Sequence, residues 1–307
     1  MNKNYFFMCT TLLFLFFVQS SMAQNETVST SVDAQGWLPA NVRDDSTVAI
    51  TTSQPRTGQV SSQGDSSIEF STTFVTPGQD KADYQLIWQT SLTAIDFPSR
   101  TLNNLTDVSY EYYRDSSSSI SANLHTPLRL YWLNDSNTPA DPTDDTFGIF
   151  IYEAVYQPGF VSPIATDSWI SENIFSSEFW VFCSDCDPSP GMSSGVVQNY
   201  DLTLSDWASG QQTGVGGDPI PPDLSNGTTY IIGMNTGVGS GWGADSLMHV
   251  DNIRIAFGAG DDQVFNFEDD LSAFPPPIPV PTLSLYGHLL LLLLFGLLMF
   301  RKRKIRL

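Results

Sequence analysis

Asp251 is the residue whose position most directly predicts a binding role. It begins a stretch in which Ile253, Ile255 and Phe257 occupy every second position. Because strand side chains alternate between faces, this pattern predicts a carboxylate on the core side of a sheet. A buried carboxylate without partners is costly. Asp251 is therefore predicted either to cap loop amides or to bind a structural Ca²⁺, which prefers hard oxygen ligands.

A second acidic run lies between two predicted strands. Its members are Asp135, Asn137, Asp141, Asp144 and Asp145. The run lacks the central glycine and the final glutamate of an EF-hand, so it is not that motif. Either a weak surface Ca²⁺ site or a solvated turn fits the composition.

No set of residues predicts a complete catalytic site. Gly191–Gly195 reads Gly-x-Ser-x-Gly, but it lies in a Pro- and Ser-rich loop rather than at the strand-to-helix turn of a nucleophile elbow. A base for that serine would have to be His125 or His249. Glu153 and Arg129 fall on apolar strands, and we expect a structural ion pair between them. The chain is expected not to be an enzyme.

Trp242 is the predicted stacking residue for a ligand. It lies in the glycine-dense segment 237–243, which lacks the Lys-Ser/Thr of a phosphate-binding loop. Its indole either stacks on a sugar ring or caps the open end of the fold. Trp37 and Trp207 are the other candidates for stacking.

Cys183 and Cys186 are the only cysteines after the first 23 residues. In an exported protein this spacing predicts a local disulfide, with a free thiol or half of a metal site as alternatives. A thioredoxin-like role needs a helix directly afterwards, and the Asp-Pro-Ser-Pro-Gly that follows does not favour one.

The net charge limits the classes of molecule that the protein can bind. The chain has 13 Lys and Arg against 33 Asp and Glu. One basic residue precedes residue 24 and five follow residue 300, so the part between them carries seven basic and all 33 acidic residues, a net charge of −26. Such a field repels phosphate backbones, so nucleic acid is excluded as a partner.

The elements that must position these residues are short strands. Stretches rich in Val, Ile, Thr, Tyr, Phe and Trp alternate with Ser, Asn, Asp and Gly clusters, which is typical of an all-β domain. We predict one two-sheet sandwich of jelly-roll type over residues 24–272. The predicted strands are 47–52, 67–75, 84–92, 108–113, 128–133, 146–156, 178–183, 200–204, 229–234, 250–257 and 264–268.

The two ends predict export. Residues 1–23 have one positive charge, an apolar centre and a final Ser-Met-Ala, as in a cleaved signal peptide. Residues 273–282 form a Pro-rich linker that includes the start of a sorting motif, and residues 283–300 predict one transmembrane helix. The basic residues in 301–307 place the tail in the cytoplasm.

The C-terminal segment resembles the IPTL-CTERM sorting signal of Gram-negative bacteria. The residues that carry the resemblance are Val280, Pro281, Thr282, Leu283, Ser284 and Gly287, followed by an apolar run and a basic tip. The resemblance implies an inner-membrane-anchored precursor that an exosortase-type transpeptidase moves to the cell surface or beyond it.

The preceding domain is similar, more loosely, to the β-sandwich ectodomains of PEP-CTERM-type surface proteins, which are like concanavalin and carbohydrate-module jelly rolls. The pieces concerned include Val108–Arg114, Phe147–Ala154 and Val250–Ile255. We expect a cell-surface binding or structural protein, with extracellular polysaccharide as a partner. The alternatives are a secreted glycan-active enzyme and a calcium-dependent adhesin.

Overall fold

The structure of the chain is a computed structural model. It describes residues 25–29, 36–53, 66–73, 80–89, 97–135, 145–184, 186, 193, 195–197, 200, 202–210, 224, 229–239, 242–258 and 260–268. The predicted signal peptide, linker, sorting motif and apolar run lie outside these residues. Within them, no helix is both long enough and apolar enough to cross a membrane.

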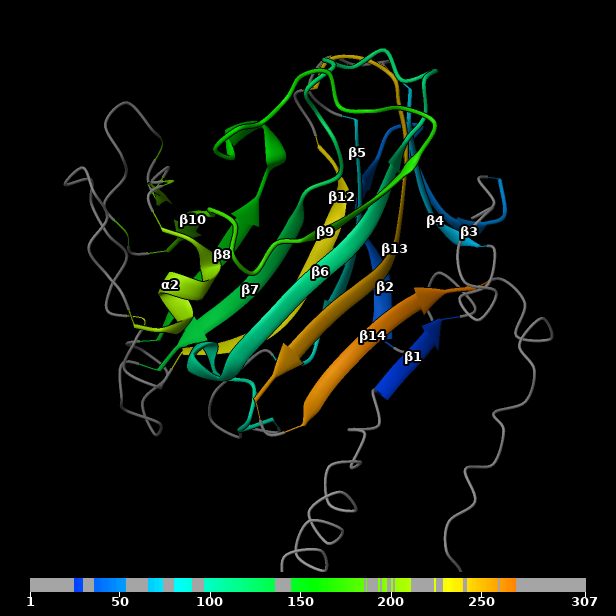
Figure 1. The fold of residues 1–307 in the computed structure, drawn as a ribbon. Helices are drawn as coiled ribbons and strands as arrows, with labels where there is room; N and C mark the ends of the chain where they lie inside the picture. The colour runs from blue at the N-terminus through cyan, green and yellow to red at the C-terminus, as the bar shows by residue number, and fades with distance from the viewer. Residues whose placement is uncertain are drawn as a thin grey trace, which may run out of the picture. The chain divides into compact units, whose positions relative to one another are not determined.

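The fold is all-β, as predicted, and consists of two facing sheets (Figure 1). The first sheet is centred on the long strand β13. Its strands are β9 (Trp169–Asn173), β6 (Leu105–Arg114), β13 (Ser246–Phe257), β4 (Ser67–Thr72), β3 (Thr47–Thr51), β14 (Asp261–Phe267) and β1 (Asn25–Ser29). All pairings in it are antiparallel except that of β1 with β14, which is parallel.

The second sheet is antiparallel throughout. In spatial order its strands are β11 (Val196–Val197), β10 (Trp180–Cys183), β8 (Thr146–Tyr152), β7 (Leu128–Asn134), β12 (Thr229–Val238), β5 (Lys81–Ile87) and β2 (Trp37–Arg43). The described helices are the short η2 (Leu102–Asn104), η3 (Ala154–Tyr156) and α2 (Leu204–Ala208).

The core fills the space between the sheets. In the central strands alternate residues point inward, and the largest of them are fully buried aromatic side chains. Trp37 is a central example, since its ring lies 5.2 Å from that of Tyr84 and 5.3 Å from those of Phe265 and Phe267. Aromatic pairs at such distances add to the stabilisation that burial alone provides.

One predicted strand, 200–204, is wrong. Among the described residues of this range, Thr203 alone pairs, in an isolated bridge to Glu178, and α2 begins at the next residue. Thr203 is the N-cap: its hydroxyl accepts from the amide of Asp206, whose carboxylate accepts from the amide of Thr203 in return. This capping box stabilises a helix start, which the strand prediction overlooked.

A fork in the first sheet displaces Asp251 from its predicted side. Residues 246–250 of β13 pair with β4, and residues 253–257 pair with β14. Between them Asn252 has φ of 47°, and the register with β6 shifts. This bulge resets the alternation, so Asp251 shares the outer face of the sheet with its partner Glu111, and the core-side prediction is wrong.

Candidate functional site

A polar cleft of about 540 Å³ opens where the edge strand β9 of the first sheet lies near the end of β8 in the second. It is lined mainly by hydrogen-bonding side chains and by two glutamates. The lining residues are Tyr152, Gln157, Pro158, Ser171, Glu172, Asn173, Ser176, Ser177, Glu178 and Thr203. Its size lies within the range of small-ligand sites in proteins.

Glu172 is the central acceptor of the cleft. The hydroxyl of Tyr112 donates to Oε1 at 3.2 Å, and that of Tyr152 donates to Oε2 at 2.6 Å. Burial, followed by the charge of Glu172, raises the pKa of both tyrosines, so both remain protonated donors. Among the described basic residues, none forms an ion pair with Glu172. A carboxylate has about four acceptor positions, so Glu172 can accept further hydrogen bonds from a ligand.

The wall opposite Glu172 is held by one glutamine side chain. Gln157 donates to the carbonyl of Glu178 at 2.8 Å and accepts from its amide at 2.9 Å. This pair of bonds imitates a strand pairing, and the bridge between Glu178 and Thr203 continues it. The cleft is therefore bounded by hydrogen-bonded backbone, which favours a largely preformed site.

His125 packs against the tyrosines that donate to Glu172. Its ring stacks on Tyr112 with centroids 4.4 Å apart, and its Nε2 accepts from the amide of Ala154 at 3.0 Å. Because Nε2 is an acceptor, the ring proton lies on Nδ1 and is donated to the hydroxyl of Tyr110, 3.2 Å away. Tyr110 in turn donates to the carbonyl of Thr126 at 3.0 Å. This arrangement accommodates only the neutral ring.

Acid should therefore destabilise the fold through His125. Burial lowers its pKa from 6.5 to about 4. Between these two pKa values the unfolded chain binds a proton at His125 and the folded chain does not. The free energy of unfolding therefore falls as the pH falls from 6.5 toward 4. Between pH 7 and pH 5 we expect this residue to contribute a loss of about 2 kcal/mol. Urea unfolding of the protein and of His125→Gln at both pH values checks this.

The variant isolates the histidine from carboxylates that titrate in the same range. His125→Gln should be less stable at pH 7, yet lose less stability than the parent between pH 7 and pH 5. Equal losses in the two proteins would show that His125 has an ordinary pKa in the fold.

A second histidine lies in a serine–histidine–glutamate arrangement. Ser67 Oγ is 3.2 Å from His249 Nδ1, and His249 Nε2 is 3.8 Å from a carboxylate oxygen of Glu69. Ser67 and His249 are both fully buried, and Glu69 also accepts from Ser53 at 2.6 Å. A nucleophile must be within reach of its substrate, so this buried group is structural. Both His125 and His249 are buried and hydrogen-bonded to residues other than Ser193.

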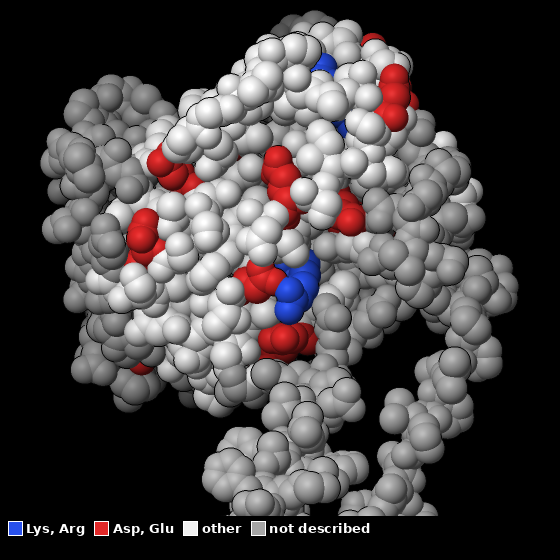
Figure 2. All heavy atoms as spheres, in the orientation of Figure 1, with Lys and Arg blue, Asp and Glu red and all other residues white. Residues whose placement is uncertain are grey.

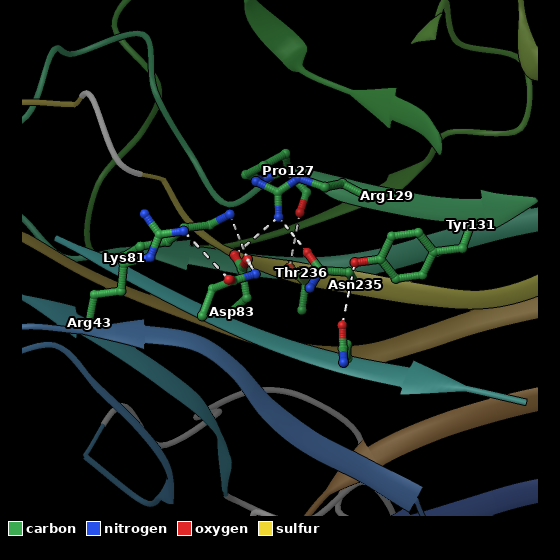
Figure 3. A network of polar contacts seen from close by, with 10 residues as sticks. Arg43, Lys81, Asp83, Pro127, Arg129, Tyr131, Asn235 and Thr236 are labelled. Carbon is green, nitrogen blue, oxygen red and sulfur yellow. Dashed lines mark hydrogen bonds and ion pairs between the residues drawn. The ribbon is translucent and has the colours of Figure 1, made fainter. Parts of the chain in front are cut away.

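The outer face of the second sheet carries a charge network in which one carboxylate is shared by two basic side chains (Figure 3). Asp83 is 2% exposed and receives Lys81 Nζ at 2.8 Å and Arg129 Nη1 at 3.3 Å, while Arg129 also donates to Asn235. Arg129 does not form the predicted close ion pair with Glu153, which accepts from the indole of Trp180 at 2.8 Å. Burial raises the pKa of Glu153, and the Trp180 hydrogen bond and the more distant charge of Arg129 oppose that rise. Cross-strand geometry brings Arg129 to Asn235, which lies directly opposite it.

Asp251 is a backbone cap in the structure. Its Oδ1 accepts from the amide of Phe267 at 3.0 Å, and its side chain is fully buried. At the same fork, Glu268 accepts from the amide of Ser66 at 3.1 Å. In the described part of the chain, no three His, Cys, Asp or Glu residues come together to hold a metal ion. Asp251 thus occupies the capping role, and Ca²⁺ at this residue stays a prediction.

The predicted tryptophans lie mostly inside the fold. Trp37 and Trp207 are 0% and 2% exposed, so neither is available to a ligand. Trp242 is half-buried against the core, with its indole beside Gly239, where an added Cβ would lie 3.4 Å from Nε1. Trp242 therefore packs partly on the core, and its stacking on a ligand stays a prediction.

Cys183 and Cys186 form a disulfide with Cα atoms 5.4 Å apart. Cys183 is fully buried at the end of β10. The bond closes a short loop beside the second sheet and lies away from the residues that line the cleft. Of the acidic run, Asp135 is 3% exposed, and Asn137, Asp141 and Asp144 lie outside the described residues.

Sequence reasoning missed Glu172, although a signal was present. Ile170, Glu172 and Ile174 occupy alternate positions, so the carboxylate shares the inward face with two apolar side chains. Register confirms this, because Glu172 lies opposite the buried Tyr110 of β6. A carboxylate at a core position predicts either a buried polar network or a site.

Acidic groups outnumber basic ones on the visible face of the molecule (Figure 2). Several of the described basic side chains are already paired with carboxylates. Arg254 pairs with Asp107 and lies 3.8 Å from Asp262, and Arg100 donates two hydrogen bonds to Asp261. The surface thus presents negative charge to any ligand.

We compared the chain with protein-family models, with curated proteins and with solved structures, and it matches none of them.

Proposed function

We propose that this is an exported β-sandwich protein that is sorted to the cell surface, where it acts in binding or as a structural component. The observation that carries the proposal is the order of three segments at the C-terminus. The motif at 280–287 precedes an apolar run, and a basic tip follows. This order suits a membrane-held precursor whose tail is a substrate of an exosortase-type transpeptidase.

Other features support export. The predicted signal peptide precedes the first strand, and the last strand, β14, ends at Phe267, shortly before the Pro-rich linker. A linker of this composition is a stiff spacer between a domain and an anchor. The proposal includes a jelly-roll connection of the strands and one transmembrane helix at 283–300. Binding rather than catalysis fits the buried histidines and the structural arrangement around His249.

The mass of the mature protein tests the proposal. We expect protein recovered from the surface of the native cells to begin at Gln24 and to lack Arg301–Leu307. The change Pro281→Ala should leave the tail attached, because it alters the motif that the transpeptidase reads. Pro277→Ala, in the neighbouring linker, is the matched control and should be processed normally.

Intact-mass spectrometry with peptide mapping of both ends reads the outcome. A mature wild-type protein that still carries residues 301–307 would make the tail an ordinary anchor. Equal processing of Pro281→Ala and Pro277→Ala would show that the motif is not what is recognised.

A further inference from the structure

The lining of the cleft restricts the chemistry of a ligand. Glu172 and Glu178 contribute carboxylates, and no lysine, arginine or histidine belongs to the lining. The remaining side chains are mostly neutral hydroxyls and amides, which can both donate and accept. Anionic ligands are disfavoured by the two carboxylates, and more so by the net charge of the domain. The ligand must therefore be rich in hydrogen-bond donors and carry no negative charge.

A bare cation and a peptide fit less well. Ca²⁺ takes six to eight oxygen ligands, typically from several carboxylates. The described residues bring no group of three His, Cys, Asp or Glu together, so the cleft offers only two carboxylates. A peptide anchors through apolar side chains. Of the lining side chains, only those of Tyr152 and Pro158 are mainly apolar, and neither belongs to an aliphatic pocket that would hold a peptide anchor.

An exposed aromatic side chain lies next to the lining in the chain. Tyr156 directly precedes Gln157 and Pro158 of the lining, is 45% exposed, and stacks on the half-buried Tyr200 with centroids 4.5 Å apart. Sugar rings combine apolar C–H faces with a rim of hydroxyls. When one sugar unit donates hydroxyl hydrogens to Glu172, the next unit of the polymer can pack its apolar face on Tyr156, because aromatic rings bind apolar surface.

We propose that the cleft between β9 and β8 binds an uncharged saccharide, with Glu172 as the acceptor for ligand hydroxyls and with Tyr112 and Tyr152 holding that carboxylate in place. The volume of about 540 Å³ accommodates more than one sugar unit. This inference rests on the proposed function in one respect. If the protein lies at the cell surface, the saccharide belongs to an extracellular polysaccharide.

An oligosaccharide array, followed by calorimetry on each positive, tests the site with the mature protein. The probes are neutral di- to tetrasaccharides, with uronic-acid oligosaccharides as the anionic counterpart. We expect at least one neutral probe to bind and the uronates to bind more weakly. Ser176→Trp fills the cleft from an exposed lining residue and should lower the affinity at least tenfold. Glu172→Gln, which removes the charge and one acceptor, should do the same.

Two control variants separate the site from the fold. Ser168→Trp makes the same change at an exposed position outside the lining, and Glu69→Gln removes a carboxylate on the distant strand β4. Both should bind like the parent. The proposal is overturned if no neutral probe binds, if uronates bind better, or if Ser176→Trp binds normally. These results are independent of tail processing, so each proposal can fail alone.

Discussion

Replacing Gly148 by alanine is expected to destabilise the protein by about 3 kcal/mol, through overpacking of a full core. Gly148 lies on β8 directly opposite Trp132 of β7. A Cβ at this position would meet the indole, whose Cζ2, Cε2 and Cη2 atoms would lie 2.0, 2.3 and 2.6 Å away. Trp132 is fully buried, so it cannot move toward solvent. The methyl group must therefore displace a tryptophan within a close-packed interior.

Chemical unfolding in urea measures this effect. Gly258→Ala is the matched control, because its Cβ would meet only ordinary contacts at 3.6 and 3.8 Å. The double variant with Trp132→Phe should lose less stability than the sum of the single changes, since the smaller ring leaves room for the methyl group. If Gly148→Ala were as stable as Gly258→Ala, the close approach of backbone and indole would be wrong.

Replacing Arg114 by methionine is the second large loss that we expect, also about 3 kcal/mol, because it leaves buried acceptors without a charged donor. Arg114 is 4% exposed at the end of β6. Its guanidinium donates to the carbonyls of Ser121 at 2.9 Å, Leu124 at 2.8 Å and Ile120 at 3.0 Å. Burial lowers the pKa of Arg114. These bonds hold the connection from β6 to β7 against the sandwich.

Three variants distinguish this clamp from a general effect of charge. Arg114→Lys keeps the charge but lacks the several N–H donors of a guanidinium. Its free energy of unfolding should therefore lie between those of the parent and Arg114→Met. Arg254→Met removes an ion pair on a 36% exposed side chain and should cost less than about 1 kcal/mol. Hydrogen exchange should accelerate first in residues 115–125 of Arg114→Met. Unchanged exchange there would contradict the clamp.

The central strands β7 and β8 are predicted because Leu128–Asn134 and Thr146–Tyr152 are rich in apolar and aromatic residues. The predicted strand 146–156 is too long, since β8 ends at Tyr152 and η3 begins at Ala154. The edge strand β3 is predicted, but two other edge strands are not: β2 reads Trp-Leu-Pro-Ala-Asn-Val-Arg and β9 reads Trp-Ile-Ser-Glu-Asn. An edge strand has one paired side and much exposed surface, so its sequence need not alternate clearly.

Residue pairings could not be predicted, because they depend on register between strands far apart in the chain. Arg129 was expected beside Glu153, but a cross-strand position places Asn235 opposite it and brings Asp83 within reach. For Asp251, a single bulge residue, Asn252, reversed the face that alternation predicted. A one-residue shift moves a side chain to the other face of a sheet.

The sequence by itself determined the fold class, the acidic surface and the expectation of export, because composition, local periodicity and the order of segments are properties of the chain alone. Only the tertiary structure decided which polar residues meet. Tyr112, Tyr152 and Glu172 come from three strands of two sheets, and their convergence at one cleft requires both sheets to be packed. Hydrogen bonds of this kind depend on long-range geometry, which no local pattern encodes.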